Sequence, residues 1–314
     1  MEIIGHSKII SFFETAIAKN KLAQSYCFAG RDQVGKKTIA HHLAAKILNI
    51  QENKLDTYPD FYYLSRQIDE KTGKLKKEIS IAQARQIKDR LGSKAWFGGY
   101  QVIIIDEAEL LNEESGNALL KLLEEAGDKR IFFLLTADDS RLLSTIRSRC
   151  QMIFFSLVSK KEIVDGLVRL GYDRMLAEEA ARLSWGKPGR AIEICQNEEL
   201  KNNFNQEIDR WRTIVSSPFY KKMKAMEDLL GEASKTETVR TSEQLQTTLE
   251  TWSVIWRNNL LDATYKKENN LVNKSGLSLI QMASLIDNFK KSQLLLSQNV
   301  NPKLIIEQLF LSLA

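Results

Sequence analysis

The sequence predicts an α/β domain built on a parallel sheet, followed by a region that is entirely helical. Three observations indicate this fold. Short apolar runs alternate with helical stretches in the first half of the chain, strand signals fade after Phe155, and from about residue 205 the apolar residues recur at helical spacing. Continuous apolar strands interleaved with helices are typical of a parallel sheet covered on both faces.

The bulk composition narrows the class of protein. A chain of 314 residues is too long for one ordinary core, so we expect two or three domains. Its 43% hydrophobic and 27% charged residues are typical of a soluble globular protein, and its net charge of +5 permits contact with a polyanion without requiring it. The N-terminus lacks a secretion signal, and no apolar run approaches the ~18 residues of a membrane span.

The cysteines also bear on the class. Cys27, Cys150 and Cys195 are far apart and odd in number. That pattern argues against a disulfide framework and against a four-cysteine zinc module. We therefore expect a cytoplasmic protein in a reducing compartment.

The expected elements follow in chain order. The predicted strands are 26–29, 61–64, 102–105, 131–136 and 152–155. A helix over 36–48 follows the first strand, and two further helices carry apolar residues at helical spacing, one with Ile81, Ala84, Ile87 and Leu91, the other with Leu119, Leu122 and Leu123. Ser80 is a candidate cap for the first of these two helices. The segment Lys71–Lys77, which contains Gly73, reads as a solvated hairpin tip rather than as a DNA contact.

The later elements are helical. Short helices are expected over 158–200, around Gly186–Gly189. Asn301 and Pro302 supply an N-cap and a first-turn proline, which predicts the start of a last helix. The apolar faces of the two final helices are Met282, Leu285, Ile286 and Phe289, and then Ile306, Leu309, Phe310 and Leu313.

The first strand leads into a glycine-rich loop that nearly matches GxxxxGK[ST]. Gly30, Gly35 and Lys36 stand in their places, but Lys37 takes the position of the hydroxyl that holds Mg²⁺, and Thr38 follows one residue late. Lysine offers donors and no lone pair, so it cannot bind the metal. The loop is interpreted either as a weak phosphate cradle or as a tight turn that binds nothing.

Two further motifs accompany this loop. Asp106 and Glu107 end an apolar strand, where an aspartate would orient a metal's water shell and a glutamate would polarise an attacking water. Acidic pairs after a strand also commonly supply charge to a helix N-terminus, which is the blander interpretation. Arg149, within Ser148-Arg149-Cys150, reads on its own as a solvated or salt-bridged surface residue.

Several segments together resemble the bacterial clamp-loader branch of the AAA+ ATPases. These segments are Ile4-Gly5-His6, 58–61, 117–125, 142–151 and 186–191, and they occur in the family's order. The resemblance is dense over residues 1–195. Beyond that it depends on the helical pattern and the closing Asn301-Pro302 helix.

The resemblance implies roles for individual residues. Arg149 would be an arginine finger acting in trans on ATP held by a neighbouring subunit. Asp106 and Glu107 match the metal-and-water motif, Thr136 matches the polar sensor of the γ-phosphate, and Ile4 with Gly5 lies beside the adenine pocket.

Three departures from the family pattern qualify these roles. Lys37 replaces the metal-binding hydroxyl. Gly189 stands where motor subunits have an arginine, with Arg190 one place later. The four-cysteine module that many relatives insert before residue 58 is missing, so no metal is predicted. The first two departures remove the chain's own ATP chemistry and spare Arg149, which favours a non-motor subunit.

The expected architecture is therefore a P-loop-like AAA+ domain (1–157), a small helical lid domain (158–204) and a helical collar domain for oligomerisation (205–314). The resemblance implies a non-hydrolysing subunit of the DNA polymerase III clamp loader, which places the sliding clamp on primed DNA during replication. Its partners would be the delta and gamma/tau subunits, the clamp and, through the complex, DNA. No cofactor is expected to bind firmly, and ATP at most weakly.

Two alternatives stay open. The chain could be an active ATPase of the gamma/tau motor type, in which Thr38 or water replaces the missing metal ligand. It could also be an unrelated α/β protein whose motifs match by chance, although several matches in order speak against that.

Overall fold

The computed structural model describes residues 2–69, 73, 75–91, 95–97, 99–125, 129–218, 220–222, 224, 245–246, 248–257, 260, 278–298 and 300–311. These residues form two compact units, 1–196 and 197–314. Each unit is described by itself. The three-domain division stays a prediction, and its boundary after residue 204 falls inside one helix, α9 (Glu198–Ser216).

The first unit contains a five-stranded sheet in the order β2-β3-β4-β1-β5, and its neighbouring strands pair in parallel. The predicted strands are confirmed to within one residue at each end. The strands are β1 (Ser25–Ala29), β2 (Phe61–Leu64), β3 (Gln101–Ile105), β4 (Arg130–Thr136) and β5 (Gln151–Phe154). All parallel strands end at the same edge of the sheet, so the loops that follow them are brought together.

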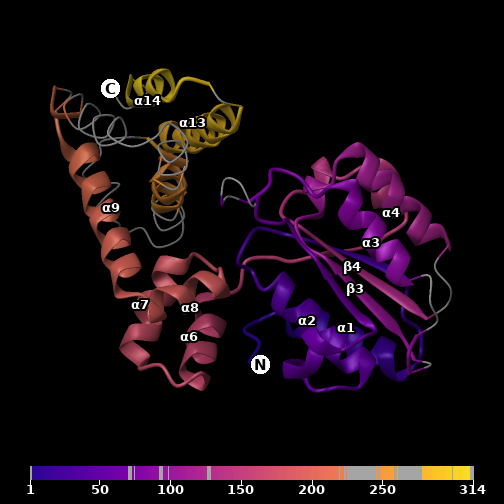
Figure 1. The fold of residues 1–314 in the computed structure, drawn as a ribbon. Helices are drawn as coiled ribbons and strands as arrows, with labels where there is room; N and C mark the ends of the chain where they lie inside the picture. Colours follow the sequence, from indigo (N-terminus) through magenta and orange to yellow (C-terminus); the bar gives the residue numbers. More distant parts are fainter. Residues whose placement is uncertain are drawn as a thin grey trace. The chain divides into compact units, whose positions relative to one another are not determined.

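Helices cover both faces of the sheet (Figure 1). On one face α1 (Ser7–Ala18) and α2 (Lys36–Leu48) pack Phe13, Ile39 and Leu43 against β1, β3 and β4. On the other, α3 (Ile81–Leu91) and α4 (Glu113–Glu125) bring Ile87, Leu119 and Leu122 onto the opposite side chains of the same strands. The α/β prediction is confirmed, whereas α1 was not predicted from the sequence.

The first unit ends in three short helices, α6 (Lys160–Arg169), α7 (Arg174–Ser184) and α8 (Pro188–Gln196). They confirm the helices expected after residue 158. Helix α6 lies against the N-terminal segment, because a Cβ added to Gly166 would come within 2.6 Å of the Ile4 side chain. Helix α5 (Ser144–Arg147) is a single turn just before β5.

The described elements of the second unit include α9, α13 (Leu279–Ser297) and α14 (Pro302–Leu311). They confirm the helical pattern, because its apolar face is buried at Leu285, Phe289, Ile306, Leu309 and Phe310. The predicted cap is also confirmed, since the side-chain oxygen Oδ1 of Asn301 accepts the Lys303 N–H at 3.0 Å. Phe289 packs on Trp211 with ring centroids 5.4 Å apart. Leu313 lies outside the described residues, as do the side chain of Met282 and two of the lysines of 71–77, Lys71 and Lys74.

The 68–75 segment is described in part. Ile68 and Leu75 form an antiparallel bridge, and Gly73 has φ +66°. Both features agree with the predicted hairpin. Among the described helices, none is long and apolar enough to cross a membrane.

Candidate functional site: a glycine-rich loop pocket and an arginine at opposite ends of the sheet

The glycine-rich loop joins β1 to α2 at the carboxyl edge of the sheet. Gly35 precedes the helix with φ +106°, a conformation that other residues adopt only with strain, and no atom of the protein lies within 4 Å of an added Cβ there. The glycine at this position is therefore required by the backbone and not by packing. The loop thus keeps the geometry in which the first N–H groups of α2 point outward.

Lys36 is turned back onto its own loop. Its ammonium donates to the carbonyl oxygens of Gly30 and Arg31, the latter at 3.1 Å, and lies 3.8 Å from the Asp32 carboxylate. The side chain is buried, and burial lowers its pKa, with the Asp32 charge opposing that shift. The lysine expected to reach a phosphate is thus already satisfied by loop oxygens.

Lys37 occupies the place where the loop pattern requires a hydroxyl. It is exposed, and its Nζ lies over the ring of Tyr63, 4.5 Å from the centroid. This is within the range of a cation–π contact. A positive charge therefore stands where the pattern would put an oxygen ligand for a cation.

Tyr63 in turn forms a hydrogen bond with Asp106, the aspartate of the acidic pair. Its hydroxyl donates to Asp106 Oδ2 at 2.5 Å, and the Glu107 N–H reaches Asp106 Oδ1 at 3.1 Å. Burial and then the Asp106 carboxylate raise the pKa of Tyr63, which keeps its proton on the phenol. Both oxygens of Asp106 thus accept hydrogen bonds from the protein.

Arg66 forms an ion pair with Glu107, the glutamate of the acidic pair. Its Nε donates to Glu107 Oε2 at 2.7 Å and its Nη2 to Oε1 at 2.5 Å, a two-pronged ion pair. Glu107 itself has φ +54°, in the left-handed region that is uncommon for a side chain of this kind. Both carboxylate oxygens of Glu107 thus accept hydrogen bonds from Arg66.

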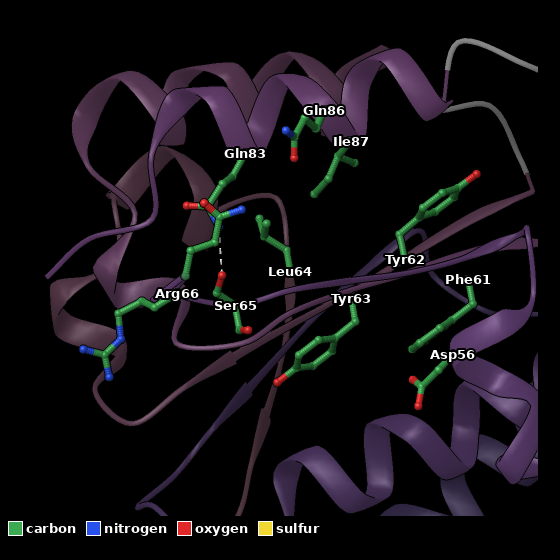
Figure 2. Close-up of a pocket in the computed structure, with 11 residues that line it drawn as sticks. Asp56, Phe61, Tyr62, Tyr63, Leu64, Ser65, Arg66, Gln83, Gln86 and Ile87 are labelled. Carbon is green, nitrogen blue, oxygen red and sulfur yellow. Dashed lines mark hydrogen bonds between the residues drawn. The ribbon is translucent and has the colours of Figure 1, made fainter. Parts of the chain in front are cut away.

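Tyr63 and Arg66 reach the acidic pair because β2 is the neighbour of β3. The register pairs Tyr63 with Ile104 and Leu64 with Ile105, so the residues after each strand meet at the same edge. Figure 2 shows Tyr63 on the side of β2 opposite to Leu64, as the alternation of a strand requires. A pocket of about 400 Å³ lies along this edge strand, and both Tyr63 and Leu64 line it.

The loop and the acidic pair line one pocket of about 350 Å³. Such a volume is at the lower end of ordinary ligand sites. Its polar end contains Gly35, Lys36, Thr38, Asp106 and Glu107, and its apolar walls are Ile3, Ile4, Pro188 and Ile192. The predicted nucleotide-site residues are therefore brought together, with two exceptions.

Those exceptions are Gly30 and Thr136, which do not line this pocket. A Cβ on Gly30 would lie 2.6 Å from the Phe155 carbonyl oxygen, so glycine is required there by the close approach of β5. Thr136 ends β4 beside Gly30. The Gly30 N–H donates to the Thr136 carbonyl at 3.1 Å, and the Thr136 hydroxyl accepts the Asp138 N–H at 3.1 Å. Both residues form the base of the loop.

Helix α8 closes the other side of the pocket. The Gly189 N–H donates to the Gln33 carbonyl at 2.9 Å, and an added Cβ would meet that oxygen at 3.1 Å. A side chain at position 189 would therefore press on the loop. Arg190 has its guanidinium 4.1 Å above the Trp185 ring, and it is not among the residues that line the pocket. This agrees with the prediction that Arg190 points elsewhere.

Arg149 lies at the opposite edge of the sheet. It precedes β5, whose first residue Gln151 pairs with Tyr26, and its carbonyl accepts the Ser25 hydroxyl at 2.8 Å. The five residues of β1 separate this edge from the loop, a distance of about 16 Å at ~3.3 Å per residue. An arginine side chain cannot cover that distance, so Arg149 does not serve the chain's own pocket.

The pocket does not suit a magnesium–triphosphate complex. The hydroxyl ligand is replaced by Lys37, and the two carboxylates are engaged by Tyr63 and Arg66. Among the described residues, no cluster of three or more His, Cys, Asp or Glu side chains is arranged to hold a metal.

Burial raises the thiol pKa of Cys27 to about 12 and that of Cys150 to about 11, so neither is a reactive thiolate.

Tyr63 and Arg66 were missed by the sequence analysis. The available signal was their position at and just after the second predicted strand. If that strand is placed beside the one that ends in Asp106, the two carboxyl ends must meet. The sequence does not state the strand order, so it did not identify the contact.

The first half of the chain is similar in sequence to known proteins. Residues 5–159 match the family model described as DNA polymerase III, delta subunit. The chain is 32% identical to the DNA polymerase III subunit delta' (delta-prime) of Escherichia coli over 167 residues, which are 52% of this chain and 46% of that protein. It is 30% identical to the tau/gamma subunit of Haemophilus influenzae over 54% of this chain and 25% of that protein.

These matches are partial. The chain spans about half the length of the delta' relatives from Escherichia coli and Pseudomonas aeruginosa. Among solved structures, a DNA polymerase III gamma subunit-related protein of Thermotoga maritima aligns over 95% of this chain and 97% of that chain, with 19% identity and a TM-score of 0.46. That likeness is too low to carry an argument about function.

The family-model match and the delta' and tau/gamma relatives agree with the order of the motifs and with the parallel sheet that positions them. Over residues 5–159, the chain belongs to the bacterial clamp-loader family of AAA+ proteins, with DNA polymerase III delta' subunits among its relatives.

Proposed function

We propose that this chain is a delta'-like subunit of a bacterial DNA polymerase III clamp loader that does not hydrolyse ATP itself. The observation that carries the proposal is the engagement of the whole acidic pair by protein groups, Tyr63 on Asp106 and Arg66 on Glu107. Together with Lys37 in the metal-ligand position, it leaves neither a metal site nor a general base. We expect Mg²⁺–ATP to bind at most weakly.

We further propose that Arg149 acts in trans as an arginine finger. Its support is positional, because Arg149 is at the edge of the sheet remote from its own pocket and is partly exposed. A guanidinium there is available to the triphosphate of an adjacent subunit, where it would stabilise charge in the transition state. The natural partners are the motor subunits named tau/gamma among the relatives, with delta, the sliding clamp and primed DNA in the same cytoplasmic assembly.

The test is steady-state ATP hydrolysis by a reconstituted loader, with primed DNA and clamp present. Arg149→Ala should lower hydrolysis at the neighbouring site, since fingers of this kind contribute ~10³–10⁵ in rate, and should leave assembly intact. Arg147→Ala is the matched control, because Arg147 is two residues away and pairs with Asp139 at 3.0 Å. An unchanged rate in the Arg149 variant would rule out the finger.

A second candidate is a motor ATPase of the gamma/tau type. It is favoured by one observation, that Gly35, Lys36, Asp106 and Glu107 still line a single pocket. ATP turnover by the isolated chain that disappears in Lys36→Ala would establish this candidate. Absence of turnover supports the non-hydrolysing subunit.

A further inference from the structure

Arg149 is held at its backbone by two elements. The Ser25 hydroxyl of β1 donates to its carbonyl at 2.8 Å, and its N–H donates to the Ile146 carbonyl of α5 at 3.0 Å. Ser25 is buried, so this anchor belongs to the core of the first unit. The position of the Cα of Arg149 is therefore fixed by the sheet.

The guanidinium is oriented by two further contacts. Nη1 donates to the Thr145 carbonyl at 2.9 Å, and Nη2 donates to Glu124 Oε1 at 2.6 Å. Glu124 stands in the last turn of α4, 25 residues away along the chain. Within the part of the chain that the structure describes, these bonds use two of the five N–H groups of the guanidinium. The other three can meet a second anion.

The pair with Glu124 is exposed on both sides, with 40% of the Arg149 side chain and 53% of the Glu124 side chain accessible. Exposed ion pairs of this kind contribute little to folding, so stability does not explain the contact. What the contact does is select one direction for a long side chain that would otherwise sample many rotamers. Holding a group in its working direction lowers the entropy lost when the reaction geometry forms.

We infer that Glu124 is a positioning residue for Arg149, which directs the guanidinium toward the phosphate of a neighbouring subunit. This inference rests on the proposed trans role of Arg149. Glu124 does not touch the nucleotide. It acts through one hydrogen bond to Nη2, while the Thr145 carbonyl fixes Nη1.

The experiment uses the reconstituted loader with primed DNA and clamp, and compares Glu124→Ala, Glu124→Gln, Arg149→Ala and the double variant Glu124→Ala/Arg149→Ala. Glu124→Ala should lower kcat about fivefold, the rate equivalent of ~1 kcal/mol, with KM for ATP and assembly unchanged. Glu124→Gln should recover most of the rate, because its amide oxygen accepts the same hydrogen bond. On the Arg149→Ala background, Glu124→Ala should have no further effect.

The matched control is Glu114→Ala, since Glu114 is exposed on the same helix. An unchanged or increased kcat in Glu124→Ala, beside a reduced rate in Arg149→Ala, would overturn the positioning role and leave the proposed function standing. An equal loss on both backgrounds would also overturn it, because Glu124 would then act by another route. If Arg149→Ala itself has no effect, the proposed function fails first.

Discussion

Arg66, just after β2, donates to both carboxylate oxygens of Glu107, just after β3, from Nε to Oε2 at 2.7 Å and from Nη2 to Oε1 at 2.5 Å. The Lys37 ammonium, which takes the place of the hydroxyl in the loop pattern, lies over the ring of the same Tyr63. In the proposed non-hydrolysing subunit, the metal chemistry of the pocket is therefore blocked at more than one side chain. Restoring a single residue should not recover it.

The first prediction follows from these separate losses. Lys37→Thr alone should leave the affinity for ATP nearly independent of Mg²⁺, because Asp106 and Glu107 stay engaged. The triple variant Lys37→Thr/Tyr63→Phe/Arg66→Ala should bind ATP about tenfold more tightly with Mg²⁺ than without, a gain of ~1.4 kcal/mol. Equilibrium binding of a fluorescent ATP analogue measures both.

The control for this prediction is Lys36→Ala placed in the triple variant, which should abolish the gain by removing the phosphate-binding lysine. If Lys37→Thr alone acquired the full Mg²⁺ dependence, Tyr63 and Arg66 would have no effect on the binding of Mg²⁺ with ATP.

The second prediction concerns Gly30. Gly30→Ala should destabilise the first unit by about 1–3 kcal/mol, as overpacking in a tight site does, because the new Cβ would lie 2.6 Å from a backbone oxygen of Phe155 and 2.8 Å from its Cβ. Chemical denaturation measures the free energy of unfolding. Gly99→Ala is the control, since no atom lies within 4 Å of a Cβ there. Equal stability of the two variants would mean that β5 yields to the new methyl group.

The third prediction is a pH dependence from His6. Its Nε2 contacts the Val34 carbonyl at 2.9 Å, its ring packs on Phe155, and burial lowers its pKa from the ordinary 6.5, although the Val34 carbonyl and the Glu162 charge oppose that shift. The unfolded chain then binds a proton more readily than the folded one. Stability from this group is complete above pH 6.5 and is lost as the pH falls through the lowered value.

The measurement is the Tm of the protein between pH 5 and pH 7.5. The advantage of the parent over His6→Gln should shrink as the pH falls. Parallel curves for the parent and His6→Gln would show that His6 does not titrate in this window.

The sequence predicted the parts of the fold that local pattern determines. All five strands and α2 were placed within one residue, because apolar runs and the glycine loop mark their ends. Helix α1 was missed, because it begins after His6, which makes no side-chain cap hydrogen bond and so gives no N-cap signal. The boundary proposed after residue 204 falls within α9, because a continuous helix carries no local signal that a compact unit begins at residue 197.

The site was predictable to the same extent. Gly35, Lys36, Thr38, Asp106 and Glu107 were identified by motif and do line one pocket. The partners of the acidic pair were not, because Tyr63 and Asp106 are 43 residues apart and Arg66 and Glu107 are 41 apart. Such contacts depend on which strands are neighbours, which spacing along the chain does not reveal.

Strand β1 has the pocket of the glycine-rich loop at one end and, through Ser25, the anchor of Arg149 at the other. In the proposed assembly, this subunit supplies a catalytic arginine to a neighbour and needs none for its own pocket. An assembly with one such subunit is asymmetric. That subunit marks a first position, from which the order of ATP hydrolysis by the motor subunits can be counted.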